Sequence, residues 1–94
     1  MKKIGFEEAE TLAKSRIKEL EKSVGCDLSI TLENTKYLSN GWIFFYNSTS
    51  FVETGEIRWA LGGNGPIFIS EDGALFELRS DLPWQEALKQ VKAN

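Results

Sequence analysis

Gly-Trp-Ile-Phe-Phe-Tyr, residues 41–46, is the stretch that decides the fold. Successive side chains of a strand point to opposite faces, so this stretch divides into two sets. One face carries Trp42, Phe44 and Tyr46, and the other carries Ile43 and Phe45. A strand with one face in water would show a polar residue at every second position. Apolar side chains on both faces therefore predict a central strand that is covered from both sides.

A helix is predicted on the N-terminal side of this strand, from Phe6 to Val24. Its apolar residues recur at spacings of three and four, which places them on one stripe. The stripe consists of Phe6, Ala9, Leu12, Ala13, Ile17, Leu20 and Val24. Acidic residues crowd the first turns and basic residues come later, which suits the helix dipole. Gly25 is placed to end the helix in a left-handed conformation.

Further strands are predicted before and after the central one. Residues 28–32 alternate apolar and polar side chains, as in a strand with one buried face. Residues 67–69 form a short buried strand, and Glu71-Asp72-Gly73 forms a hairpin turn. Residues 74–79 form the returning strand. One face of this strand would carry Ala74, Phe76 and Leu78.

The connecting segments have less definite patterns. Residues 34–36 and 39–41 have the composition of turns. Residues 51–52 either continue the central strand or begin a bend, and residues 55–60 fit no pattern. Residues 62–66 contain three glycines and a proline, so they are predicted to be irregular.

A short helix is predicted to close the chain from about Leu82. Ser80 or Asp81 would cap it, and Pro83 suits its first turn. Its apolar stripe consists of Trp84, Ala87, Leu88 and Val91. The predicted fold is therefore α+β, with an N-terminal helix, about four antiparallel strands in one sheet and a short C-terminal helix. We expect residues 1–94 to form a single domain.

Composition and charge exclude several classes of function. The net charge is −3, and residues 26–80 hold three basic and seven acidic side chains, so a nucleic-acid partner is not expected. No run of residues is long and apolar enough to span a membrane. The N-terminus lacks the apolar core of a secretory signal, and Cys26 is the only cysteine. We expect a cytoplasmic protein without a membrane partner.

The sequence carries no pattern typical of an enzyme. There is no histidine, so the commonest general base and zinc ligand is missing. The glycines at 62–65 lead into Pro66 and a strand, whereas a phosphate-binding loop leads into a helix. Glu53 and Glu56 are the alternative candidates, as an acid/base pair, but the sequence suggests no pocket around them. We expect no catalysis, no metal, no cofactor and no small-molecule substrate.

Residues suited to protein binding are the remaining candidates. Trp59 stands beside Arg58 and near Glu53 and Glu56, a composition typical of protein–protein hot spots. The structural alternative is that Trp59 covers the edge of the core. Acidic side chains at the predicted hairpin tip complete the set. The candidate partner-binding residues are Glu53, Glu56, Trp59, Glu71 and Asp72.

Three runs of this middle region carry distinctive motifs: residues 41–47, residues 51–55 and residues 61–69. They contain a Gly-Trp-aromatic strand, a Glu-Thr-Gly and a Leu-Gly-Gly-Asn-Gly-Pro loop. Together these runs resemble the immunity protein 35 family, which includes small YrhB-like proteins. The shared residues are Gly41, Trp42, Glu53, Thr54, Gly55, Leu61, Gly62, Gly63, Asn64, Gly65 and Pro66. The resemblance spans about residues 41–90.

The resemblance implies a non-catalytic role. Members of the family occur as immunity proteins of bacterial polymorphic toxin systems, which bind a toxin domain and block it. A YrhB-like member is instead described as a small chaperone-like protein. The resemblance also implies that most motif residues set the fold and the loop geometry. Binding of a cognate toxin domain is the leading hypothesis, and binding of unfolded clients by a chaperone is the alternative.

Overall fold

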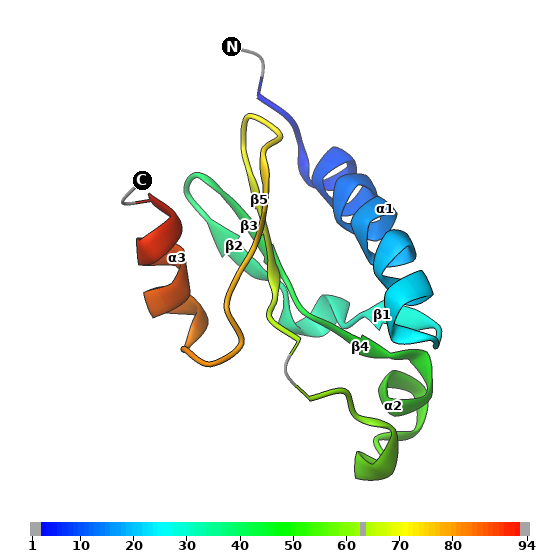
Figure 1. The fold of residues 1–94 in the computed structure, drawn as a ribbon. Coiled ribbons are helices and arrows are strands. Elements are labelled where there is room, and N and C mark those ends of the chain that lie inside the picture. Colours follow the sequence, from blue (N-terminus) through cyan, green and yellow to red (C-terminus); the bar gives the residue numbers. More distant parts are fainter. Residues whose placement is uncertain (1–2, 63, 93–94) are drawn as a thin grey trace.

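The computed structural model describes residues 3–62 and 64–92. It has the predicted α+β fold, with a helix at each end and strands between them (Figure 1). The helices are α1 (Phe6–Val24), α2 (Thr49–Thr54) and α3 (Trp84–Lys92), and the 3-10 turns are η1 (Leu32–Asn34) and η2 (Ile57–Trp59). The strands are β1 (Leu28–Ile30), β2 (Lys36–Leu38), β3 (Gly41–Phe44), β4 (Tyr46–Ser48), β5 (Ile67–Ser70) and β6 (Leu75–Glu77).

The strands form two antiparallel sheets, so the prediction of about four strands in one sheet was wrong in this respect. One sheet has the order β2-β3-β5-β6, and the other pairs β1 with β4. The division falls at Phe45, which separates β3 from β4. In the segment that pairs with these two strands, η1 separates β1 from β2. The pairing is therefore interrupted on both sides, and the strands divide into two sheets. Residue 36, predicted in a turn, begins β2 instead.

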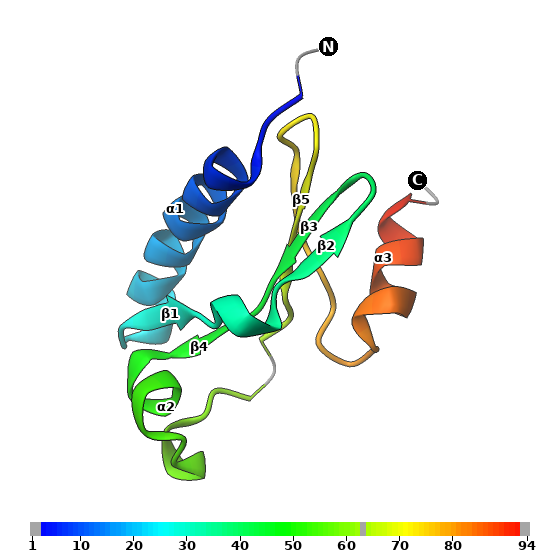
Figure 2. The same cartoon turned by 180° about the vertical axis from the view of Figure 1, so that it is seen from behind.

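Helices cover both faces of the larger sheet, as the central apolar stretch predicts. Figures 1 and 2 show α1 on one side of β3 and β5 and α3 on the other. Phe44 is fully buried on the α1 side, with Trp42 and Tyr46 packed against the same cluster. Ile43 is fully buried on the α3 side, where Phe45 joins it. Two apolar clusters, one on each face, therefore form the core.

Only part of the predicted stripe of α1 is buried. Ala9, Ala13 and Ile17, spaced four residues apart, pack against the sheet, and their small or branched side chains allow close approach. Leu12 lies beside the row formed by Ala9, Ala13 and Ile17, and Val24 lies in the last turn of α1. Both side chains are exposed. These two residues of the stripe therefore lie outside the buried part of the helix.

The ends of the other elements follow the local chemistry. The hairpin turn at residues 71–73 is confirmed, with the Gly73 N–H donating to the Ser70 carbonyl at 2.9 Å. Helix α3 begins directly after Pro83, whose carbonyl accepts the N–H groups of Glu86 and Ala87 at 3.0 Å. The prediction that Ser80 or Asp81 caps this helix was wrong, since Pro83 precedes Trp84 and the Asp81 carboxylate accepts from the Arg79 guanidinium.

Candidate protein-binding surface

Residues 49–66 connect β4 to β5 and lie outside both sheets (Figure 1). We call this segment, which contains α2 and η2, the excursion. Helix α2 begins because the Ser48 hydroxyl accepts the Phe51 N–H at 3.1 Å. It ends at Gly55, which adopts φ 74° and donates its N–H to the Phe51 carbonyl. Residues 51–52, predicted as a strand extension or a bend, are therefore helical. The two caps determine this outcome.

Side-chain hydrogen bonds hold the excursion against β4. The Ser48 hydroxyl, which is buried, donates to the Trp59 carbonyl at 2.6 Å. The Asn47 side-chain oxygen accepts the Leu61 N–H at 2.7 Å. The Asn64 side-chain amide donates to the Tyr46 carbonyl at 2.8 Å. Backbone groups that a loop would leave to water are thus satisfied by side chains, and the path of the excursion is fixed.

Replacing Ser48 by alanine is expected to destabilise the protein by about 2 kcal/mol. The change removes a helix cap and leaves the partly buried Trp59 carbonyl without its donor. Hydrogen exchange at residues 55–61 should become faster, because the clamp on η2 is lost. Urea unfolding and exchange mass spectrometry measure the two effects. Ser50→Ala is the matched control, since this serine is exposed and its hydroxyl has no hydrogen bond within the described residues. An equal loss in both variants would contradict the assignment.

The tip of the excursion exposes two large apolar side chains. Ile57 is 83% exposed and Trp59 is 45% exposed, and neither belongs to a core cluster. The Arg58 guanidinium lies over the Trp59 ring at 5.1 Å from its centroid and 3.3 Å from the Glu56 carboxylate. We call this group, together with Glu53, the η2 surface. Exposed apolar side chains on a fixed backbone are typical of a binding surface.

A cleft of about 520 Å³ adjoins the η2 surface. Its lining includes Cys26, Asp27, Glu53, Arg58 and Trp59. The carboxylates of Asp27 and Glu53 have no hydrogen bond or ion pair within residues 3–62 and 64–92. Cys26 is exposed and free. The cleft therefore presents two unpaired carboxylates beside an aromatic ring, together with the Arg58 guanidinium, which pairs with Glu56.

The five candidate partner-binding residues lie in two separate places. Glu53, Glu56 and Trp59 belong to the η2 surface, whereas Glu71 and Asp72 lie at the tip of the β5–β6 hairpin. Figures 1 and 2 show this hairpin tip at the opposite end of the molecule from α2. Both tip carboxylates are engaged within the chain. Glu71 lies 3.3 Å from the Lys3 ammonium, and Asp72 accepts the Ser70 hydroxyl. Their role in partner binding stays a prediction, and we leave them outside the η2 surface.

The hydrogen bond at the hairpin tip predicts a pH dependence of stability. The Ser70 hydroxyl donates to Asp72 and holds the pKa of this carboxyl below its ordinary value. The folded state then binds fewer protons than the unfolded state between the two pKa values. Its stabilisation is complete above about pH 4 and is lost as the pH falls through the folded pKa.

Asp72→Asn is therefore expected to reduce the fall in stability between about pH 4 and pH 2. Urea midpoints measured across this range test the expectation. Ser70→Ala should produce the same flattening by removing the donor, and the double variant should add nothing further. If both single variants lost stability between about pH 4 and pH 2 as steeply as the wild type, the hydrogen bond between Ser70 and Asp72 would not form in solution.

Most residues of the family motif have structural roles in this arrangement. The Thr54 hydroxyl donates to the Ser50 carbonyl and accepts the Glu56 N–H, and Gly55 ends α2. Gly41 lies so near the Ile69 carbonyl that a side chain would not fit. Trp42 packs against the core, the Asn64 amide donates to the Tyr46 carbonyl of β4, and the Pro66 carbonyl accepts the Leu78 N–H.

The other motif residues of the loop differ in their surroundings. Leu61 packs against the core on the α1 side, and Gly65 contacts the backbone at Leu78. Gly62 has open space beside it, and Gly63 lies outside the described residues. The Glu53 side chain makes no hydrogen bond or ion pair with the residues that the structure describes.

Sequence reasoning missed Ile57 and Asp27 as surface residues. An isoleucine in a segment without apolar periodicity, next to Gly55 and Glu56, is a signal of an exposed apolar side chain. Asp27 comes near Glu53 only because β1 pairs with β4, which no local pattern indicates. In the described part of the chain, no three potential metal ligands lie together. None of the helices described there has the length and apolar character needed to cross a bilayer.

Comparison with known proteins gives a consistent result. The family model described as Immunity protein 35 matches residues 7–91. The chain is also 33% identical over 67 residues to "Uncharacterized protein YrhB" of Escherichia coli (strain K12), an alignment that covers 70% of this chain and 71% of that protein. No solved structure gives a significant match.

Proposed function

The chain belongs to the immunity protein 35 family, and from this premise we propose that it binds a bacterial toxin domain and blocks it without catalysis. The η2 surface is the contact that we assign to this binding. The single observation that carries the assignment is the exposure of Ile57 and Trp59 on a backbone that Ser48 and Asn47 hold in place.

The physical argument rests on preorganisation. A loop that orders on binding loses conformational freedom and therefore affinity, whereas a loop that is already fixed does not. Tryptophan is among the residues that dominate binding free energy when a partner covers them. Ile57 and Trp59 flank Arg58 on one turn, so a partner that covers η2 would bury all three side chains.

The charge of the surface favours a basic partner. Asp27 and Glu53 line the adjoining cleft without an ion pair within the described residues, whereas the Arg58 guanidinium in the same lining pairs with Glu56. Glu56 is partly neutralised by Arg58. Complementary charge on a partner speeds association and excludes like-charged competitors. We therefore propose that the toxin surface which meets η2 carries arginine or lysine side chains around an apolar pocket.

A pull-down from the native cells tests the proposal. The tagged chain is captured at about 300 mM salt, where incidental contacts between surface charges are screened. One stoichiometric polypeptide with toxic activity, retained by the wild type and lost by Ile57→Ala/Trp59→Ala, would support the proposal. Retention of that polypeptide by the double variant would reject the η2 surface as its contact.

The chaperone alternative predicts a different outcome in the same experiment. A holdase would return many sub-stoichiometric, aggregation-prone proteins. The exposed large apolar side chains belong to several elements, α1, η1, β2, η2 and β6: Leu12, Val24, Leu32, Tyr37, Ile57, Trp59 and Phe76. This distribution favours binding of one partner at η2.

A further inference from the structure

Strand β1 has an open edge, and hydrogen-bond geometry identifies the groups on it. The Thr31 N–H donates to the Phe45 carbonyl at 2.8 Å, and the Thr49 N–H donates to the Asp27 carbonyl at 2.9 Å. Residues 27 and 31 thus face β4. Backbone groups alternate along an antiparallel strand, so those of Leu28 and Ile30 point away from β4. The Leu28 N–H does so, because it donates to the Glu21 carboxylate at 2.8 Å.

The remaining groups on this edge have no partner within the described residues. The small sheet contains only β1 and β4 in the described chain, so no strand there pairs with the outer side of β1. The Ile30 N–H and the Ile30 carbonyl therefore have no backbone partner there, whereas Leu28 is buried at the end of the edge that Glu21 contacts. An unpaired edge of this kind accepts extended peptides by β-augmentation.

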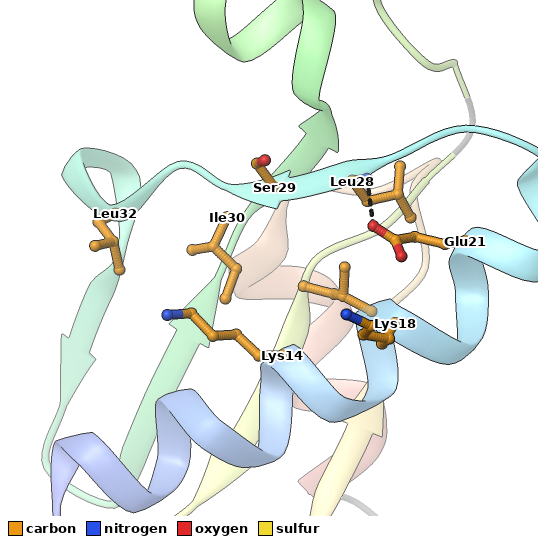
Figure 3. A pocket seen from close by; sticks show the side chains of 8 residues that line it. Lys14, Lys18, Glu21, Leu28, Ser29, Ile30 and Leu32 are labelled. Carbon is orange, nitrogen blue, oxygen red and sulfur yellow. Dashed lines mark hydrogen bonds between the residues drawn. The ribbon is translucent and has the colours of Figure 1, made fainter.

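A pocket of about 390 Å³ lies between this edge and α1 (Figure 3). Ile30 and Leu32 point into it from the strand side, and Lys14 and Lys18 reach it from the helix. Glu21 also lines the pocket, but its carboxylate already accepts the Leu28 N–H. The free charge that faces an incoming chain is consequently positive, in a protein whose net charge is −3.

Both lysines are available for a new ion pair. Lys18 has no ion pair within the described residues. Lys14 pairs with Glu10 at 3.3 Å, one turn along α1, and its side chain is 62% exposed. The Glu10 side chain is less exposed, at 19%, but an i,i+4 ion pair on a helix contributes little, and the lysine can turn to another carboxylate.

The spacing of the lysines matches a strand. Four residues of helix rise about 6 Å, which separates Lys14 from Lys18 along α1. Alternate residues of a strand, whose side chains share a face, lie about 6.6 Å apart. Since α1 and β1 run side by side, two acidic residues at positions i and i+2 of an added strand would meet the two ammonium groups.

We propose that the edge of β1 binds an extended, acidic segment of a protein partner. The segment pairs with Ile30 through backbone hydrogen bonds and places two carboxylates at Lys14 and Lys18. This site is distinct from the η2 surface and does not rest on toxin binding. The opposing interpretation is that the lysines only protect the edge from pairing, as lysines on edge strands often do.

Selection from a library of random linear dodecapeptides tests this proposal on the full chain. The enriched peptides are expected to carry Asp or Glu at positions i and i+2 between β-branched residues. Their affinity should fall at least 10-fold for Lys14→Ala/Lys18→Ala and should weaken with rising salt. Bound peptide should also slow hydrogen exchange of the Ile30 amide.

Two controls separate this site from other effects. Lys22→Ala/Lys89→Ala removes the same charge elsewhere and should leave peptide affinity unchanged. Ile57→Ala/Trp59→Ala should also leave it unchanged, so failure here and failure of the η2 proposal are distinguishable. No acidic enrichment, equal losses in both lysine variants or unaltered exchange at Ile30 would overturn the proposal. A wild-type dimer in sedimentation that protects Ile30 would overturn it in favour of a second copy of the chain.

Discussion

Replacing Gly65 by alanine is expected to lower the free energy of unfolding by about 3 kcal/mol. A β-carbon at this position would lie 1.8 Å from the Leu78 carbonyl oxygen and 2.8 Å from the Leu78 carbonyl carbon. Both are backbone atoms, so no rotation of a side chain relieves the overlap. The Leu78 N–H also donates to the Pro66 carbonyl at 2.9 Å, which holds the two segments together. Residues 65–66 and Leu78 must therefore move apart, and the hydrogen bond between the Leu78 N–H and the Pro66 carbonyl is lost.

The size of this effect makes it easy to measure. A loss of about 3 kcal/mol corresponds to a fall in Tm of about 12–24 °C for a chain of this size. Gly62→Ala is the control within the same loop, because no atom of the described residues beyond its chain neighbours lies within 4 Å of the position that a β-carbon would take there. Its effect should stay within about 0.5 kcal/mol. An equal change in Tm for Gly65→Ala and Gly62→Ala would show that Gly65 does not lie close to Leu78 in solution.

Removing both apolar side chains of η2 is expected to weaken partner binding by about 100-fold or more. Each side chain that anchors an interface contributes about 2 kcal/mol on truncation, although paired losses are not strictly additive. The fold should survive Ile57→Ala/Trp59→Ala, because the hydrogen bond from Ser48 goes to the Trp59 backbone carbonyl, which alanine retains. Titration calorimetry with the captured partner measures the loss, and thermal melting checks the fold.

Leu12→Ala is the matched control for this prediction. Leu12 is a large apolar residue on α1 that is 38% exposed, comparable to Trp59, and it lies outside the η2 surface. Its truncation should change affinity less than about 3-fold. An equal loss for Leu12 would point to α1 as the contact. An unchanged affinity in the double variant would remove the η2 surface from the binding site.

Sequence patterns predicted best where short-range chemistry decides the structure. The bounds of α1 follow from the spacing of its apolar residues and from Gly25, which adopts φ 83° at the end of the helix. The central strand follows from apolar side chains on both faces, and the hairpin from Asp72-Gly73. Each of these signals lies within a few residues of the element that it determines.

The errors arose where contacts distant in sequence decide the structure. Lys36–Leu38 has the composition of a turn at its start, yet it forms a strand because β3 offers a free edge. Phe51 and Val52 favour strands by propensity, but the caps at Ser48 and Gly55 select a helix. Val24 fits the helical period but lies at the end of α1, outside the core.

The same reason decides which candidate residues the sequence could group correctly in space, and their role in binding stays a prediction. Glu53, Glu56 and Trp59 are near in sequence, and a short helix and turn keep them near in space. Glu71 and Asp72 were grouped with them on charge alone, and charge does not indicate which end of a sheet a hairpin occupies. Ile57 was missed because an isolated apolar residue in an unassigned segment gives no periodicity to interpret.

The hydrogen bonds from Asn47 and Asn64 have a consequence for how such a protein diversifies. They join the two ends of the excursion at β4, so the stretch between them is anchored independently of the side chains at its tip. Under the proposal that the η2 surface contacts the partner, substitutions at residues 56–59 are expected to alter recognition with little effect on folding. The tip of the excursion can therefore be exchanged as a unit, so that new binding specificities evolve or are grafted there while α1, α3 and the sheets remain unchanged.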